Sequence, residues 1–259
     1  MLIGVQSALE YRVNTLLLLV SCFFPILIQI YMWQALYGNS GEAQLFNYTY
    51  PQMMLYAVLA TVISKIIAAD FCGAVAEDIK SGGLSKYLIK PISYISYITC
   101  QFIGDKIANI SVLIVIAAVM LILFSVIYSI SFSLSALLLF ILAIFVAMVL
   151  KFMISYLISC MAFWLTESGG ILQAVNVVGL VLSGAYFPLD IFGPAAMIFL
   201  RVLPFYYTIY FPVNIINGML RGSEIYYGLL IQIGWIIALR FLISRVWAKG
   251  MRLYIAVGG

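Results

Sequence analysis

The chain has 259 residues, of which 66% are hydrophobic and 8% are charged, and its mean hydropathy is +1.17. Since a soluble globular domain is about half apolar, this composition excludes a water-soluble enzyme or binding domain and predicts one helical membrane domain over residues 1–259. The net charge of +4 fits positive flanks of membrane spans and gives no reason to expect nucleic-acid binding. Histidine is absent, which removes Ser-His, Cys-His and the usual zinc-protease chemistries, so we predict no catalytic residue and no metal site.

A membrane span needs about 20 mostly apolar residues. The sequence predicts six such spans, at residues 13–37, 51–76, 103–128, 134–165, 171–187 and 226–247. Residues 1–12 carry Glu10 and Arg12 among apolar positions, a pattern that suits an amphipathic helix lying at the membrane interface. The expected fold class is therefore an all-α integral membrane protein with six transmembrane helices.

Lysine and arginine decide the expected orientation, because they are enriched in cytoplasmic loops. If both termini are cytoplasmic, nine of these residues lie inside and two, Arg201 and Arg221, lie outside, while Lys65 and Arg240 fall within spans. The inside set is Arg12, Lys80, Lys86, Lys90, Lys106, Lys151, Arg245, Lys249 and Arg252. This imbalance predicts cytoplasmic termini and a cytoplasmic loop between the second and third spans.

That loop, residues 77–91, holds two acids and three lysines between two long apolar stretches. A membrane protein that concentrates its charge in one internal loop is expected to present that loop to a soluble partner. A short helix ending at Lys90 and Pro91 would give a rigid lever tied to the spans on both sides. The alternative is an ordinary positively charged loop that only sets topology, and both interpretations can hold together.

Four prolines between residues 188 and 212 forbid one continuous helix before the last span. The apolar run from Pro194 to Pro204 is too short to cross a bilayer. We predict a re-entrant hairpin over residues 187–212 that enters from the outer face, which is allowed where neighbouring helices or water satisfy its backbone. Phe187, Phe205 and Tyr206 would then form a hydrophobic plug. The alternative is a Pro-rich loop resting on the lipid headgroups.

Charged residues within the predicted spans have two interpretations. Lys65 and Asp70 lie late in the second span, Lys151 lies in the fourth and Arg240 in the sixth, and each costs roughly 2.5–3.5 kcal/mol at a helix centre on insertion scales. The three basic side chains can extend to the cytoplasmic interface and reduce this cost. Otherwise these residues line a pathway for a cationic or amphipathic substrate, with Lys65 and Asp70 as the candidate polar residues.

The chain resembles the permease subunits of type-2 ABC exporters, in particular the six-span permeases of bacterial drug and peptide exporters. The resemblance covers nearly the whole chain and rests on the order of several short motifs. These are Glu77…Ile79…Gly82-Gly83-Leu84…Leu88-Ile89-Lys90-Pro91, then Gly184…Phe187-Pro188-Leu189, Leu203-Pro204-Phe205 and Phe211-Pro212.

The resemblance implies a cytoplasmic coupling helix that docks on an ATPase and a broken hairpin at an outer gate. The coupling residues would be Glu77, Asp78, Lys80, Gly82, Leu84, Leu88, Lys90 and Pro91. The outer-gate residues would be Phe187, Pro188, Pro204, Phe205, Phe211 and Pro212.

The function implied is export of a drug, peptide or lipid-like substrate across a bacterial cytoplasmic (inner) membrane, by a homodimer or half of a heterodimer of permeases. The chain has no Gly-x-x-x-x-Gly-Lys-Ser/Thr loop, so ATP and Mg²⁺ would be bound by a separate P-loop ATPase, and this chain would be no enzyme by itself. An ion-coupled secondary transporter is the alternative. The lack of an inverted repeat and the few midplane polar residues argue against it.

Overall fold

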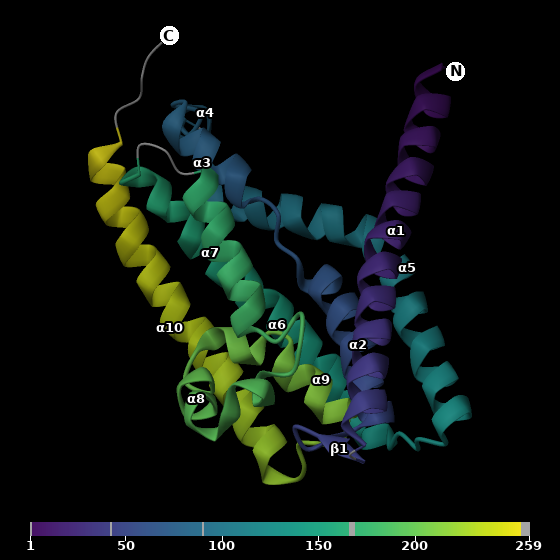
Figure 1. Cartoon of the computed structure of the whole chain (residues 1–259). Helices are drawn as coiled ribbons and strands as arrows, with labels where there is room; N and C mark the ends of the chain where they lie inside the picture. Colours follow the sequence, from purple (N-terminus) through teal and green to yellow (C-terminus); the bar gives the residue numbers. More distant parts are fainter. Residues whose placement is uncertain (1, 42, 90, 166–168, 255–259) are drawn as a thin grey trace.

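A computed structural model describes residues 2–41, 43–89, 91–165 and 169–254 of the chain. Helices dominate these ranges, which confirms the predicted all-α membrane fold. In chain order the elements are α1 (Leu2–Ser40), β1 (Gln44–Leu45), β2 (Tyr48–Thr49), α2 (Tyr50–Ile67), α3 (Cys72–Lys80), α4 (Ser85–Leu88), α5 (Tyr94–Tyr128), α6 (Leu134–Ser159), η1 (Cys160–Phe163), α7 (Gly169–Leu182), η2 (Leu189–Phe192), α8 (Gly193–Leu200), η3 (Pro204–Tyr207), α9 (Tyr210–Ile216) and α10 (Ser223–Leu253). Figure 1 shows them as one bundle.

Within the described residues, five helical segments are long and apolar enough to cross a membrane: 20–39, 50–80, 110–128, 134–163 and 223–253. The bent pair Leu189–Leu200 and Pro204–Ile216 makes a sixth if it is counted as one span. The predicted fifth span is α7, which has 14 residues and is about 21 Å long at 1.5 Å per residue. This is shorter than the ~30 Å hydrocarbon core, so α7 needs the chain that follows it to complete the crossing.

The two ends of the bundle differ in what they carry. Figure 1 shows the start of α1, the end of α10 and the pair α3 and α4 at one end, with the β1–β2 hairpin and α8 toward the other. Helix α1 is continuous over its 39 residues, so residues 2–12 extend the first span and form no separate helix. The side chains of Glu10 and Arg12 lie outside the described part, and the interfacial position of this segment stays a prediction.

Short polar side chains set where several helices begin. Ser93 Oγ accepts a hydrogen bond from Ser96 N at the start of α5, and Ser133 Oγ accepts one from Ala136 N at the start of α6. Such caps satisfy backbone N–H groups that have no partner within the helix. Helix α5 therefore begins before the predicted span at residue 103. Its first part runs across the end of the bundle before residues 110–128 descend (Figure 1).

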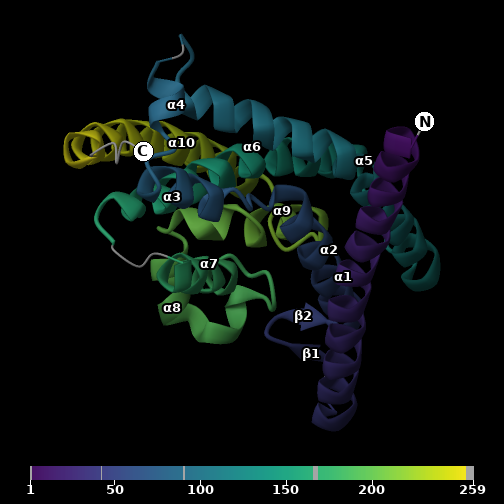
Figure 2. The same ribbon diagram turned by 90° about the horizontal axis from the view of Figure 1, so that it is seen from above.

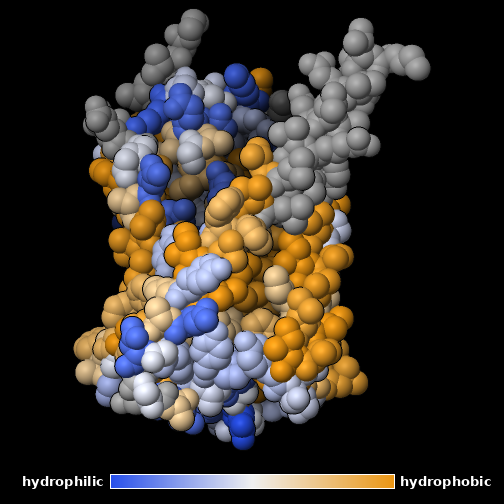
Figure 3. Space-filling model, turned by 45° about the vertical axis from the view of Figure 1, so that its right-hand side comes forward, coloured by the Kyte–Doolittle hydropathy of each residue, from blue (hydrophilic) through white to orange (hydrophobic). Residues whose placement is uncertain are grey.

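The core lies around α2, in which 13 of 18 residues are buried. Helices α1 and α5 both contact α2, and α6 contacts α10, α9 and α2. A helix that is apolar all round suits such a central position. The large apolar side chains exposed on α1, α5 and α10 form a hydrophobic surface around the middle of the face seen in Figure 3, with hydrophilic residues toward both ends. This is the surface that a bilayer requires.

Candidate functional site

The chain breaks between α2 and α3, where the sequence predicted one span over residues 51–76. Helix α2 ends at Ile67 and α3 begins at Cys72, and Asp70 lies exposed in the interruption. The interruption contains neither Pro nor Gly, so an acid within an apolar run was its only signal. Asp70 therefore lies in the link between two helices, and its carboxylate is not confined to one face of a helix.

The predicted coupling helix consists of two short helices joined at two glycines. Helix α3 ends at Lys80, Gly82 takes a positive φ of 78°, and α4 begins at Ser85. A positive φ favours glycine. A Cβ at Gly83 would lie 2.7 Å from Asp78 Oδ1, so the second glycine is needed for the close approach of α4 to α3.

Two of the predicted coupling residues hold this segment in place. Asp78 accepts a hydrogen bond from the Tyr94 hydroxyl (Oδ2, 2.7 Å), and Leu84 is 1% exposed. The Tyr94 ring stacks on Trp247 of α10, with centroids 5.6 Å apart. Burial, and then this bond to Asp78, raise the pKa of Tyr94. The segment is therefore tied to α5 and α10 through inward-facing groups.

Other residues of the same segment face outward. Glu77, Lys86 and Pro91 are exposed, and Ile89 is 86% exposed. Ile89 belongs to the motif that carries the family resemblance but is not among the expected coupling residues. Figure 2 shows α4 standing out from the bundle. The Leu88 side chain and Lys90 lie outside the described part of the chain, so their predicted contacts stay predictions.

Tyr94→Phe is expected to loosen the segment between α3 and α4 without unfolding the bundle. Removing the hydroxyl leaves Asp78 without this donor, a loss of about 1.5–3 kcal/mol for a bond to a charged group. Amide hydrogen exchange over residues 78–88 should accelerate, while exchange in α2 stays unchanged. Tyr226→Phe is the control, because Tyr226 is exposed at the start of α10. Equal exchange in both variants would show that Tyr94 does not hold the segment.

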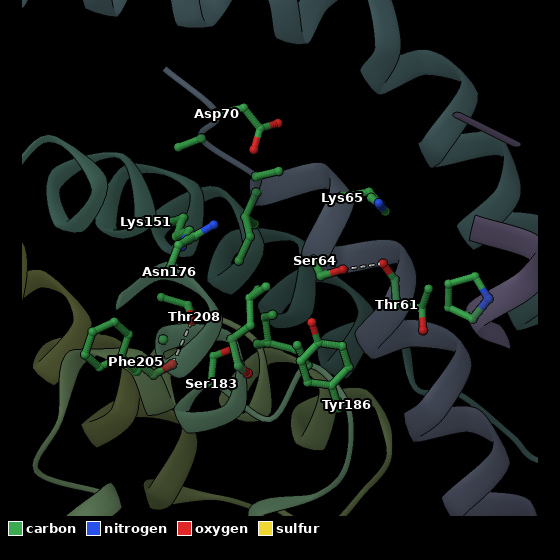
Figure 4. A pocket seen from close by; sticks show the side chains of 18 of the residues that line it. Thr61, Ser64, Lys65, Asp70, Lys151, Asn176, Ser183, Tyr186, Phe205 and Thr208 are labelled. Carbon is green, nitrogen blue, oxygen red and sulfur yellow. Dashed lines mark hydrogen bonds between the residues drawn. The ribbon is translucent and has the colours of Figure 1, made fainter. Parts of the chain in front are cut away.

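A cavity of about 300 Å³ with a largely apolar lining and several polar side chains lies between α1, α2, α6, α7 and η3. Both predicted pathway residues, Lys65 and Asp70, line it together with Lys151. Its uncharged polar lining is Gln29, Thr61, Ser64, Asn176, Ser183, Tyr186 and Thr208. Figure 4 shows Lys151 and Asn176 on one side of the cavity, with Thr61 and Lys65 on the other.

Lys151 is the buried charge of this cavity. It is 7% exposed, and its Nζ donates to Asn176 Oδ1 at 3.0 Å, which joins α6 to α7. The Lys151 side chain therefore does not extend to the cytoplasmic interface of the membrane, which is one of the two interpretations that the sequence left open. Opposite, Gln29 donates to Thr61 Oγ1 at 3.1 Å, while its own Oε1 is buried with no hydrogen-bond partner.

Asp70 borders two further hollows besides this cavity. One, of about 320 Å³, lies between α3 and α7 and is lined by Glu77, Lys80 and Asn176 among others. The other, of about 310 Å³, lies between the end of α2 and α5. Burial lowers the pKa of Lys106, which lines the second hollow, to about 8. The face in Figure 3 is hollowed toward its upper end, with hydrophilic residues inside.

The predicted outer hairpin is a bent pair of helical segments, Leu189–Leu200 and Pro204–Ile216, at 114° to each other. Its aromatic residues do not meet in one plug. Phe187 contacts Phe192, Phe205 lies against Gly179 of α7, and a Cβ at Gly228 of α10 would overlap the Phe211 ring. Phe205 is the one that also lines the cavity. Pro188 precedes η2, Pro204 opens η3, and Pro212 is buried in α9.

Asp190 in η2 ties this hairpin to the end of the bundle that carries β1 and β2. Its Oδ2 accepts hydrogen bonds from the hydroxyls of Tyr48 (2.8 Å) and Tyr210 (2.7 Å). The Tyr48 oxygen also lies 2.9 Å from Asn214 Oδ1. The chain segments before α2, in η2 and in α9 are therefore joined by one carboxylate. No local pattern in the sequence marks Asp190, because its partner Tyr48 is 142 positions away.

The described residues contain no group of three or more His, Cys, Asp or Glu side chains placed to hold a metal ion. A family model described as ABC-2 family transporter protein matches residues 23–258. No curated protein and no solved structure matched the chain significantly. The matched range includes α2 to α10, the cavity and the bent hairpin. The chain therefore belongs to the ABC-2 transporter family, as a multi-pass membrane permease of an ABC transporter.

Proposed function

We propose that this permease exports a hydrophobic or amphipathic substrate, and that an ATPase on a separate chain drives it by docking on residues 77–91. The observation that carries the proposal is the position of Ile89. It is an apolar side chain, 86% exposed, on a segment that stands out from the end of the bundle (Figure 2). A side chain of this kind is suited to a pocket on a protein partner.

The hollow between α3 and α7 supports a route from the docking segment to the cavity. Glu77 and Lys80 line the hollow near the end of α3, and Asp70 and Asn176 border both the hollow and the cavity. Movement of α3 by the ATPase would therefore change the wall of the route directly. In the proposed direction of export, a substrate would load from the cytoplasmic end and leave past the bent hairpin.

The remaining assignments follow from the same plan. ATP and Mg²⁺ are bound by the partner ATPase, and a second permease, identical or homologous, faces this one, since one chain leaves the route open at its side. The complex lies in a bacterial cytoplasmic membrane with both termini of this chain inside, as the distribution of lysine and arginine favours.

Co-purification tests this function. The tagged chain is purified from native membranes, its stoichiometric partners are identified by mass spectrometry, and the same is done for Ile89→Asp. We expect a P-loop ATPase with the wild type and at least about tenfold less of it with the variant. Burying an isoleucine is worth about 1.5–3 kcal/mol, and about 1.4 kcal/mol is tenfold in affinity.

Tyr226→Asp is the matched control, because it places the same charge on an exposed residue at the opposite end of the bundle. Leu84→Asp is a poor probe of docking, since Leu84 is buried and the change would disturb the fold. Equal ATPase recovery with Ile89→Asp and wild type would contradict the docking site. A chain that purifies alone and moves substrate in liposomes with an ion gradient would establish secondary transport instead.

A further inference from the structure

We propose that the cavity binds the head group of an anionic amphiphile, with the anion at Lys151 and a hydrogen-bond donor beside it directed at acceptors elsewhere in the lining. As a description of the transported substrate, this rests on the proposed function. As a binding site, it stands on the cavity alone. The chemistry required is a carboxylate, an adjacent N–H or O–H group, and an apolar chain.

The charges of the cavity favour an anion. Two lysines, Lys65 and Lys151, and one acid, Asp70, line it. The acid lies exposed in the break between α2 and α3, whereas Lys151 is 7% exposed. The deepest charge is therefore positive. Because burial lowers the local dielectric, the ammonium group of Lys151 gains more from an opposite charge than an exposed lysine does.

Lys151 and Asn176 have donors left for this anion. An ammonium group has three N–H bonds, and one of them goes to Asn176 Oδ1. Because that oxygen faces Lys151, the NH₂ group of the same amide remains for a second acceptor. A carboxylate can accept from both groups, which would satisfy donors that the protein itself leaves open.

The rest of the lining offers acceptors, with Thr61 and Ser64 across from Lys151 and Thr208 beside Asn176 (Figure 4). The hydroxyl hydrogens of Thr61, Ser64, Ser183 and Thr208 all point to backbone carbonyl oxygens, so their oxygens keep free lone pairs. Gln29 adds a buried Oε1 that has no hydrogen-bond partner. A bare fatty acid would leave these acceptors unused. An acylated amino acid, in which an amide N–H lies next to the carboxylate, matches both the donors and the acceptors.

The apolar chain has a place along the rest of the lining. Pro25, Leu180, Ala185, Phe205 and Ile209 contribute apolar surface to the same cavity. The volume of about 300 Å³ is at the lower end of small-molecule sites. It holds a head group and the first carbons of a chain, and the rest of the chain extends from the open side.

Binding of four probes of equal chain length tests the proposal. The purified complex is placed in nanodiscs and titrated, without ATP, with radiolabelled N-lauroylglycine, its methyl ester, N-lauroylsarcosine and dodecyltrimethylammonium. The ester lacks the charge, and the sarcosine lacks the amide hydrogen. We expect N-lauroylglycine to bind tightest, the ester and the cation at least about tenfold weaker, and the sarcosine weaker by about threefold to tenfold.

Lys151→Gln should weaken the binding of N-lauroylglycine by about tenfold and leave the binding of the ester unchanged, because the variant removes only the charge interaction. Lys249→Gln is the control, an exposed lysine of α10 outside the cavity, and should leave all four affinities unchanged. Tighter binding of the cation, equal binding of acid and ester, or an unaffected Lys151→Gln variant would overturn the anion site. Equal binding of N-lauroylglycine and N-lauroylsarcosine would overturn the role of the acceptors.

The probe series on wild-type protein decides the matter even if Lys151→Gln does not fold. The outcome is also separate from that of the proposed function. If an ATPase co-purifies but the complex shows no preference for the anionic probe, the proposed export function stands and this ligand class is excluded. If binding depends on Lys151 in a chain that purifies without an ATPase, the binding site stands and the proposed function is excluded.

Discussion

Gly184→Ala is expected to leave little folded protein in the membrane. Gly184 has a φ of +78°, and a Cβ there would overlap the Tyr56 hydroxyl and lie 3.2 Å from Tyr210 Cβ. Tyr56 is fully buried and donates to Gly184 O at 2.7 Å, so it cannot move away freely. Backbone strain costs about 1–3 kcal/mol and overpacking about 1–3 kcal/mol more, a large share of a typical 5–15 kcal/mol.

The measurement is the yield of monodisperse protein on size exclusion and its melting temperature in one detergent. Gly234→Ala is the control, since a Cβ at Gly234 in α10 meets nothing within 4 Å. Tyr56→Phe combined with Gly184→Ala should recover part of the yield, because it removes the hydroxyl that the new methyl group meets. Wild-type yield and melting temperature in Gly184→Ala would show that the turn after α7 is adaptable.

The features that the sequence predicted well are those carried by local chemistry. Apolar runs of about 20 residues predict spans, and the prolines from 188 to 212 predict a broken segment. The structure has both, with a bend of 114° where the prolines required one. Charged residues within apolar stretches, such as Lys65 and Asp70, also indicated the cavity that they line.

The features that the sequence could not predict depend on contacts between distant residues. Nothing in the sequence indicated that Tyr94 would donate to Asp78 or that Leu84 would be buried. For Lys151 the sequence left open both extension to the interface and a polar lining, and its partner Asn176 lies on another helix. Which face of a segment is buried is decided by tertiary packing, and no single-sequence pattern in these segments encodes it.

Helix α7 connects the regions that would have to move together during transport. It lines the hollow beside α3 through Gln173, supplies Asn176 to the cavity, and ends before the turn at Gly184. That turn bonds to Tyr56, and Ser183 O accepts from Tyr210 N at the outer hairpin (2.9 Å). A displacement of α3 can therefore reach the outer end along one short helix.

Asp190→Ala is expected to release the outer hairpin from the bundle and lower the melting temperature of the complex. The carboxylate accepts from two tyrosine hydroxyls, and bonds to a charged group contribute about 1.5–3 kcal/mol each. Tyr48 is fully buried and Tyr210 is 4% exposed, so water cannot replace the lost acceptor easily. Tyr48→Phe and Tyr210→Phe should each cost about half as much as Asp190→Ala.

The order of these effects separates hydrogen bonding from packing. Because the Tyr48 hydroxyl also has Asn214 Oδ1 at 2.9 Å, the double variant Tyr48→Phe/Asp190→Ala should be less stable than Asp190→Ala, by less than the cost of Tyr48→Phe alone. Glu224→Ala, an exposed acid at the start of α10, should change stability by less than about 0.5 kcal/mol. If Asp190→Ala has the same melting temperature as Glu224→Ala, apolar contacts such as that of Phe211 with Gly228 hold the hairpin without the carboxylate. If the melting temperature of Asp190→Ala is well below that of Glu224→Ala, the hydrogen bonds to Asp190 must open before the hairpin can move.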